Sequence, residues 1–253
     1  MLRESVLNKD PAAALLAREA GPAVNPDLIE LAGHTDPKVR RTALNCLRET
    51  GGTDASLAMV KALEDDDPQV RGAALKGLQT RPDPASYGPL LEAYSRVADA
   101  YARQEIALLA GRMPAANAIE IRGVCGSEDN PQARQGCIAA LARSGDAAAQ
   151  AEFIKHLESS RGRERSRYLE YCAYIDAAWL LKPLAKILED TSPMVRIGVD
   201  ARPDLISHLR ACDIAVNLVA SIGRTSFSFA VNRATNFTPA QIAEVRVFLD
   251  KLP

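Results

Sequence analysis

Apolar residues recur along this chain with a helical spacing, and the whole pattern returns about every 31 residues. Three, four and seven residues after a repeated arginine stand mostly apolar side chains, as with Ala74, Leu75 and Leu78. This spacing places them on one face of a helix. The marking arginines are separated by 31 or 32 residues: Arg40, Arg71, Arg103, Arg134 and Arg165. Such a period is the signature of a solenoid, in which each repeat buries its apolar face against its neighbours.

Each repeat reads as two antiparallel helices joined by an acidic turn. In the repeat around Arg71, residues 56–63 carry a first apolar stripe and residues 64–67 are acidic. Asp67 is a suitable N-cap because its carboxylate accepts from unpaired backbone N–H groups of the first turn. Pro68 then occupies the first helical position, where its missing N–H is harmless. We therefore expect a core that buries one side chain of each repeat: Leu44, Leu75, Ile138 and Leu169.

The pattern divides the chain into a single solenoid with four segments. Residues 1–24 are expected to cap the first repeat, and residues 25–190 to form regular repeats. The predicted helix pairs cover about 25–50, 54–80, 85–112, 115–144 and 146–175, and a sixth pair opens at 177–188.

The sixth repeat is interrupted. It repeats the turn signature at Ser192–Arg196, but Asp200 and Pro203 then occupy positions that should be apolar. Proline at that place breaks a helix. We therefore expect an insertion over 191–204, with the helix resuming at about 205–222.

The last 27 residues hold four of the five phenylalanines, and Thr238–Gln241 is a capping box that starts a final helix. Residues 205–253 are therefore expected to hold the last repeat helix and a C-terminal cap. Any β structure should be limited to a short ribbon around Ser226–Phe229.

The segments Asp36–Leu47, Asp67–Leu78 and, more weakly, Asn130–Leu141 follow the pattern D-P-x-V-R-x-x-A-L-x-x-L. This pattern resembles the HEAT repeat, in its short bacterial, phycobilisome-lyase-like form, over about residues 25–190. The resemblance implies an all-α, right-handed α-α superhelix of about six helix pairs. It also implies that the repeated arginine pairs with an aspartate of an adjacent repeat. We therefore expect a structural ladder, rather than a ligand site, at Arg40, Arg71, Arg103 and Arg134.

Composition narrows the function classes. The net charge of −1 gives no long-range attraction for nucleic acid or an anionic membrane. No stretch approaches 20 consecutive apolar residues, and the first ten residues lack the pattern of a secretory signal. The five cysteines have irregular spacing, and Cys137 and Cys172 fall at apolar positions, as expected of buried free thiols in the cytoplasm.

Catalytic and metal-binding motifs are missing. His34, His156 and His208 lie far apart, and none is followed by Glu, unlike the His-Glu pairs of HEAT-type iron hydroxylases. No nucleophile elbow, phosphate loop or zinc spacing occurs. We therefore predict a protein that is not an enzyme and needs no cofactor or metal.

The exposed positions of each second helix should follow the arginine by one, five and eight residues. These positions are polar and basic only at the N-terminal end, which disfavours a nucleic-acid groove and favours a protein partner. They read Arg41/Asn45/Arg48, Gly72/Lys76/Gln79, Gln104/Leu108/Gly111, Gln135/Ala139/Ala142 and Ser166/Glu170/Ala173.

The repeat around Arg165 departs most from the pattern. It has an arginine-rich turn over 161–167, followed by Tyr168, Tyr171 and Tyr174. Arginine and tyrosine are typical of binding hot spots. Tyr168 alternatively fills the core, and a charged turn can be merely solvated. We expect a partner to bind this turn and the following insertion, reaching the concave side near Glu170. The predicted contact residues are Arg161, Arg163, Arg167, Tyr171, Arg196, Asp200 and Arg202.

The sequence thus predicts a non-catalytic, cytoplasmic scaffold that binds another protein: an adaptor, an assembly factor or a toxin-neutralising immunity protein. Two alternatives stay open, a nucleic-acid-binding HEAT-like solenoid and a chromophore lyase subunit. The identity of the partner and the oligomeric state are left undetermined.

Overall fold

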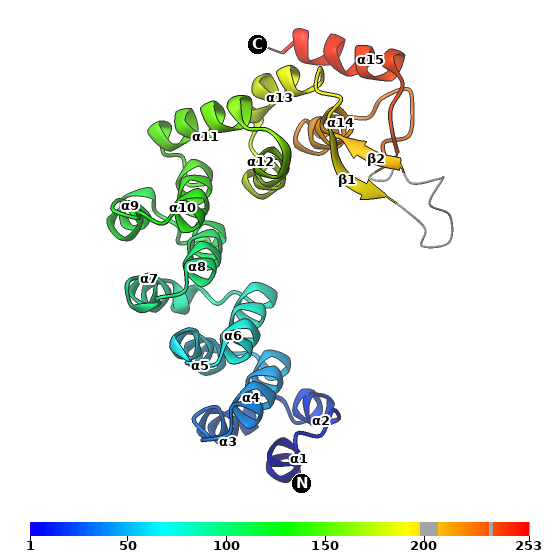
Figure 1. Ribbon diagram of the computed structural model, residues 1–253. Helices are drawn as coiled ribbons and strands as arrows, with labels where there is room; N and C mark the ends of the chain where they lie inside the picture. Colours follow the sequence, from blue (N-terminus) through cyan, green and yellow to red (C-terminus); the bar gives the residue numbers. More distant parts are fainter. Residues whose placement is uncertain (198–206, 233–234, 253) are drawn as a thin grey trace. The chain divides into compact units, whose positions relative to one another are not determined.

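Short antiparallel helices follow one another along most of the chain, as the repeat pattern predicts (Figure 1). A computed structural model describes residues 1–197, 207–232 and 235–252. The chain divides into two compact units, residues 1–144 and 145–253. The predicted all-α solenoid is confirmed in its helical character, and each unit is described by itself below.

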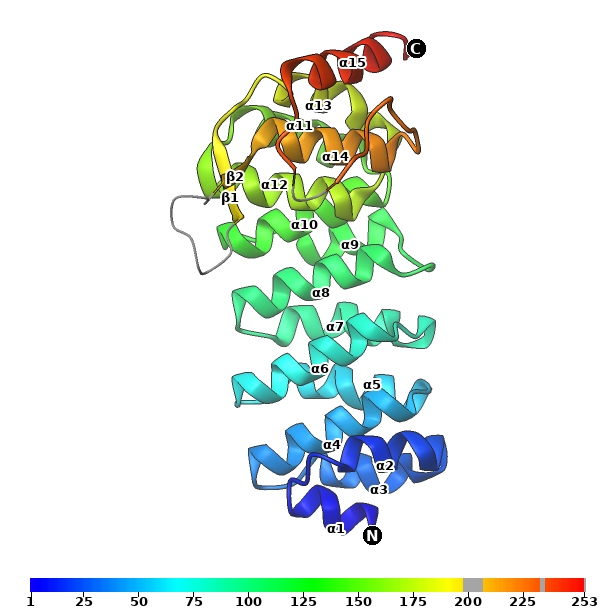
Figure 2. The same cartoon turned by 90° about the vertical axis from the view of Figure 1, so that its right-hand side faces the viewer.

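The first unit stacks its helices in two layers. One layer holds the first helices of each pair, α3 (Asn25–Leu31), α5 (Thr53–Lys61), α7 (Tyr87–Arg96) and α9 (Ala118–Cys125). The other layer holds the longer second helices, α4 (Pro37–Thr50), α6 (Pro68–Thr80), α8 (Ala100–Arg112) and α10 (Pro131–Arg143). Successive second helices pack side by side, as Figure 2 shows.

The N-terminal segment is itself a helix pair. Helix α1 (Leu2–Leu7) contacts α3, and α2 (Ala13–Ala20) packs on α4 in the layer of second helices. Residues 1–24, expected as a cap, thus extend the stack by one short pair.

Local capping follows the prediction for the acidic turns. The Asp67 carboxylate accepts from the amides of Gln69 and Val70, and Pro68 opens α6. Asp36, Asp99 and Asn130 cap α4, α8 and α10 in the same way. The four side chains predicted to be buried are buried: Leu44, Leu75, Ile138 and Leu169.

Helices α8 and α10 approach one another more closely than the repeat pattern predicts. A Cβ added to Gly136 would lie 2.7 Å from Cγ and 2.9 Å from the carbonyl oxygen of Gln104. Gln104 was expected on the exposed stripe, but only 8% of it is exposed. Gly111, Ala139 and Ala142 are also buried, so the stripe is wrong at these four positions. At Gln104 the reason is Gly136 of α10, which lacks a side chain and so lets the two helices approach closely there.

The second unit begins with two regular helices and then changes. Helices α11 (Ala147–Ser159), α12 (Gly162–Ile175) and α13 (Leu181–Ile187) are followed by strands β1 (Pro193–Ile197) and β2 (Ser207–Arg210). The strands are antiparallel, with Val195 opposite Leu209 and Arg196 opposite His208. Helices α14 (Ala211–Ile222) and α15 (Pro239–Asp250) complete the unit.

The β structure corrects two expectations. The predicted ribbon at Ser226–Phe229 is absent from the described residues there, and a ribbon forms at the insertion instead. The resumed helix begins at Ala211 rather than near 205, because Ser207–Arg210 pairs with β1. Val195 and Leu209 form a cross-strand apolar pair, which favours the extended form.

A buried carboxylate fastens the C-terminal segment to α14. Asp213 is fully buried and accepts from the Arg210 guanidinium at 2.7 and 2.8 Å and from the Phe237 amide at 2.8 Å. Arg210 also donates to the Phe237 carbonyl. The capping box of Thr238 and Gln241 forms as predicted, and α15 packs on α13 and α14.

Candidate functional site

The repeated arginines of the first unit pair with carboxylates of the following repeat. Arg40 binds Asp65 at 2.7 Å, Arg71 binds Asp99 at 3.7 Å, and Arg103 binds Glu128 at 2.8 Å. In each case Nη1 also donates to the carbonyls five and six residues upstream, which fixes the turn between the helices. This geometry supports the proposal of a structural arginine ladder. Arg134, the fourth predicted member, is exposed.

Arg165 of the second unit behaves like the ladder arginines. It is almost fully buried, pairs with Asp190 and donates to the Glu158 carbonyl at 3.0 Å. It stands in register with Arg40 and Arg71 but was not included in the predicted ladder. The period alone would have identified it.

The residues predicted to bind a partner have different environments. Arg161, Arg163 and Arg167 are exposed at the start of α12. Tyr171 is only 5% exposed, so its place among the contact residues is wrong. Arg196 lies in β1, and Asp200 and Arg202 lie outside the described residues.

The tyrosines of α12 fill the core of the second unit. Tyr168 stacks on His156, with ring centroids 5.4 Å apart, and meets Phe153 edge-on at 5.3 Å. Burial raises the pKa of Tyr168. The alternative interpretation of Tyr168, that it fills space, is the one that the packing supports.

A groove opens beside these tyrosines, between α12, α14 and the ribbon. Its volume is about 360 Å³. In Figures 1 and 2 these elements lie next to one another. The described lining residues are Ser166, Leu169, Glu170 and Ala173 of α12, Val195 and Leu209 of the ribbon, and Ile214, Asn217, Leu218 and Ser221 of α14.

The groove has an apolar floor and a polar rim. Leu169 and Leu218 are buried at its base, whereas 43% of Val195 is exposed on its wall. Ser166, Asn217 and Ser221 provide neutral polar groups along the edges. Glu170 is the one charged residue among the described lining residues, and it is exposed. An apolar concavity edged by a few polar groups is typical of a binding site.

Three lining residues stand at positions that the repeat pattern predicts to be exposed. Ser166, Glu170 and Ala173 follow Arg165 by one, five and eight residues. The contribution of α14 was not predicted. A signal existed, because Ile214 and Leu218 lie four residues apart beside the apolar face of that helix, and a helix apolar on two sides has more than one neighbour.

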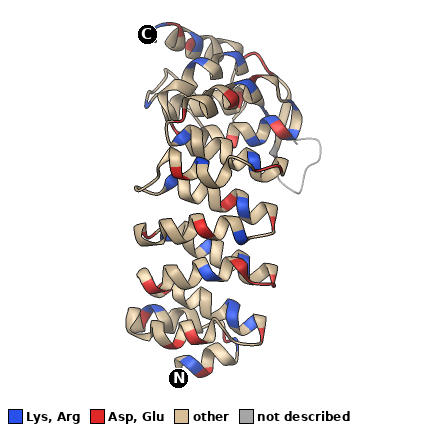
Figure 3. Cartoon of the chain, turned by 90° about the vertical axis from the view of Figure 1, so that its left-hand side faces the viewer, with Lys and Arg blue, Asp and Glu red and all other residues tan. Residues whose placement is uncertain are grey.

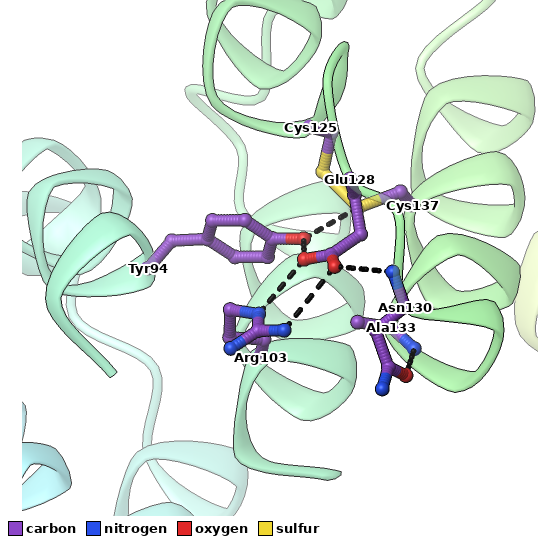
Figure 4. The surroundings of a disulfide bond; sticks show 7 residues. All are labelled: Tyr94, Arg103, Cys125, Glu128, Asn130, Ala133 and Cys137. Carbon is purple, nitrogen blue, oxygen red and sulfur yellow. Dashed lines mark hydrogen bonds and ion pairs between the residues drawn. A yellow bond between two sulfur atoms is a disulfide. The ribbon is translucent and has the colours of Figure 1, made fainter. Parts of the chain in front are cut away.

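The first unit holds an unexpected disulfide bond between Cys125 and Cys137 (Figure 4). Around it, the Tyr94 hydroxyl donates to Glu128 at 2.6 Å, and Arg103 donates to the same carboxylate. Burial alone would raise the pKa of Glu128, but these hydrogen bonds outweigh burial and lower it. The prediction of a free thiol is therefore wrong for Cys137.

Of the remaining cysteines, Cys172 is a buried free thiol as predicted. The predicted cytoplasmic location stays a prediction.

Other kinds of site find little support in the described part of the chain. No group of three or more His, Cys, Asp and Glu residues there could hold a metal ion. None of its helices combines the length and apolar character needed to cross a bilayer. In Figure 3 basic and acidic residues are interspersed along the first unit, rather than gathered in a basic stripe.

Comparison with known proteins agrees with the repeat pattern. The model of HEAT repeats matches residues 9–79 and 25–110. The narrower phycobilisome-lyase-like form stays a prediction. A search of curated proteins found no match for the chain.

Proposed function

We propose that this chain, a HEAT-repeat protein over residues 9–110, is a scaffold that binds another polypeptide through the groove between α12 and α14. HEAT repeats commonly mediate protein interactions, which supports the general role. The groove is the single observation that supports a binding site between α12 and α14.

A polypeptide suits the groove better than nucleic acid. Its floor is apolar, and the one charged side chain among its described lining residues, that of Glu170, is a carboxylate, which would repel phosphate. The net charge of the whole chain is −1, so it supplies no compensating attraction. Apolar side chains of a partner would instead remove Val195 and the half-buried Leu209 and Ile214 from water.

The exposed arginines of the predicted patch border the same surface. Arg163, Ser166, Arg167 and Glu170 are spaced three, four and seven residues apart, so they lie on one face of α12. The arginine-rich turn and the groove are therefore neighbouring parts of one surface. Whether the scaffold serves as an adaptor, an assembly factor or an immunity protein depends on its partner.

Selection from a displayed library of random peptides on the immobilised full chain tests this proposal. Ala173→Arg would place a long charged side chain in the groove without removing a core residue. Ala151→Arg is the matched control, because Ala151 is exposed on α11 and does not line the groove. We expect selected peptides to bind Ala151→Arg like the wild type and Ala173→Arg at least tenfold more weakly. Equal binding to both variants would show that the groove is not the site.

A further inference from the structure

We propose that the occupant of the groove is an amphipathic helix that carries an acidic and a basic residue two turns apart beside its apolar stripe. This inference rests on the proposed function, because it specifies what the groove binds.

The lining residues set the length and periodicity of the occupant. On α12 they lie at 166, 169, 170 and 173, and on α14 at 214, 217, 218 and 221. Both sets follow the spacing i, i+3, i+4, i+7, so the groove runs along two turns of each helix, or about 10 Å. An amphipathic helix laid in such a groove inserts apolar anchors with this same spacing.

An extended peptide fits the groove less well. A peptide strand gains its affinity from main-chain hydrogen bonds to an exposed sheet edge. The ribbon, however, lines the groove with the side chains of its cross-strand pair Val195 and Leu209. Because the groove meets the face of the ribbon rather than its edge, a bound strand would find no backbone partners there. A helix satisfies its own backbone hydrogen bonds and needs none.

The charges specify the flanks of the occupant. Arg163 and Glu170 are exposed, and neither has an ion-pair partner among the described residues. Two other carboxylates of this unit do have ion-pair partners, since Glu158 pairs with Lys186 and Glu189 with Arg246. Arg163 and Glu170 lie seven residues apart on one face of α12, about 10 Å along its axis. A partner helix that places an acid near Arg163 and a base near Glu170 would complement both.

Fluorescence anisotropy with labelled synthetic peptides tests this inference on the full chain. Each probe is an alanine-rich peptide of about 15 residues with leucines at i, i+3, i+4 and i+7. One version carries Glu at the N-terminal flank and Lys at the C-terminal flank, and a second exchanges them. A third places proline at the centre of the stripe, which prevents the helix.

We expect one charge order to bind at least tenfold more tightly than the other, and the proline peptide to lose binding. In the double variant Arg163→Glu/Glu170→Lys the preferred order should invert. Both residues are exposed, and an unchanged circular dichroism melting curve would show that the variant is folded.

Three results would overturn the inference: equal binding of the proline peptide, a charge preference that the double variant leaves unchanged, or no binding of either helical peptide. If library-selected peptides still distinguish Ala173→Arg from Ala151→Arg in those cases, the groove remains the binding site. Only the helical occupant is then rejected.

Discussion

Reducing the Cys125–Cys137 bond should destabilise the first unit by a predictable amount. The bond joins the end of α9 to the middle of α10 across 12 residues of sequence. A cross-link over a loop of this size removes chain entropy worth about 3 kcal/mol from the unfolded state. The Arg103–Glu128 pair does not depend on the bond and should survive its reduction. We therefore expect a loss of about 3 kcal/mol and no loss of fold.

Urea unfolding with and without a reducing agent measures this loss. Circular dichroism follows the helices of both units, whereas the single tryptophan, Trp179, reports only on the second unit. The reductant should therefore shift the dichroism transition and leave a fluorescence transition near its original midpoint. Cys46→Ala, which removes a buried free thiol, should retain the effect of the reductant. Cys125→Ala/Cys137→Ala should abolish it.

Alkylation of the unfolded, unreduced protein decides whether the bond exists. Mass spectrometry should find three modified cysteines, namely Cys46, Cys172 and Cys212. Five modified cysteines would refute the bond itself. Three modified cysteines with an unchanged urea midpoint would refute the entropic reasoning instead.

Two further predictions concern packing and pH. Gly136→Ala should destabilise the protein by about 1–3 kcal/mol, because the new methyl group meets the Gln104 backbone. Gly72→Ala, where the methyl group enters open space, should be neutral or stabilise the protein by up to about 1 kcal/mol. The urea midpoints of the two variants measure this difference, and equal effects would contradict the close contact at Gly136. Burial would raise the pKa of Asp213, but its hydrogen bonds from Arg210 and Phe237 outweigh burial and lower that pKa. The ionised Asp213 carboxylate should therefore stabilise the folded state fully above its unfolded pKa of about 4. This stabilisation should vanish as the pH falls through the lower pKa of the folded protein. Asp213→Asn should lower the stability at pH 7 by about 3 kcal/mol. It should also flatten the acid dependence of the urea midpoint, which Trp179 fluorescence monitors. If the acid dependence of that midpoint is unchanged, the Asp213 carboxylate is not its source.

The helix pairs could be predicted from the sequence because their causes are local and repeated. Asp67 caps a helix through amides two and three residues away, and Leu75 is buried because it shares a face with Ala74 and Leu78. Such short-range relations are visible in the sequence itself. The same period identifies Arg40, Arg71 and Arg103, since each meets its carboxylate about one repeat later.

The candidate site could be predicted only in part. Ser166, Glu170 and Ala173 follow from the period, but Val195, Leu209 and Ile214 line the groove because of how the ribbon and α14 pack on α12. The burial of Tyr171, which removed it from the predicted contact residues, is likewise a result of packing.

Sequence spacing by itself thus determined the helices, their caps and their apolar faces, since these depend on residues within about one turn of each other. The tertiary structure decided which polar positions a neighbouring helix covers, as at Gln104, and which cysteines meet, as at Cys125 and Cys137. It also decided where two helices leave a groove. The physical reason is that helix-to-helix distance depends on the side chains of both partners at the contact, and a single glycine such as Gly136 changes it without altering the repeat pattern.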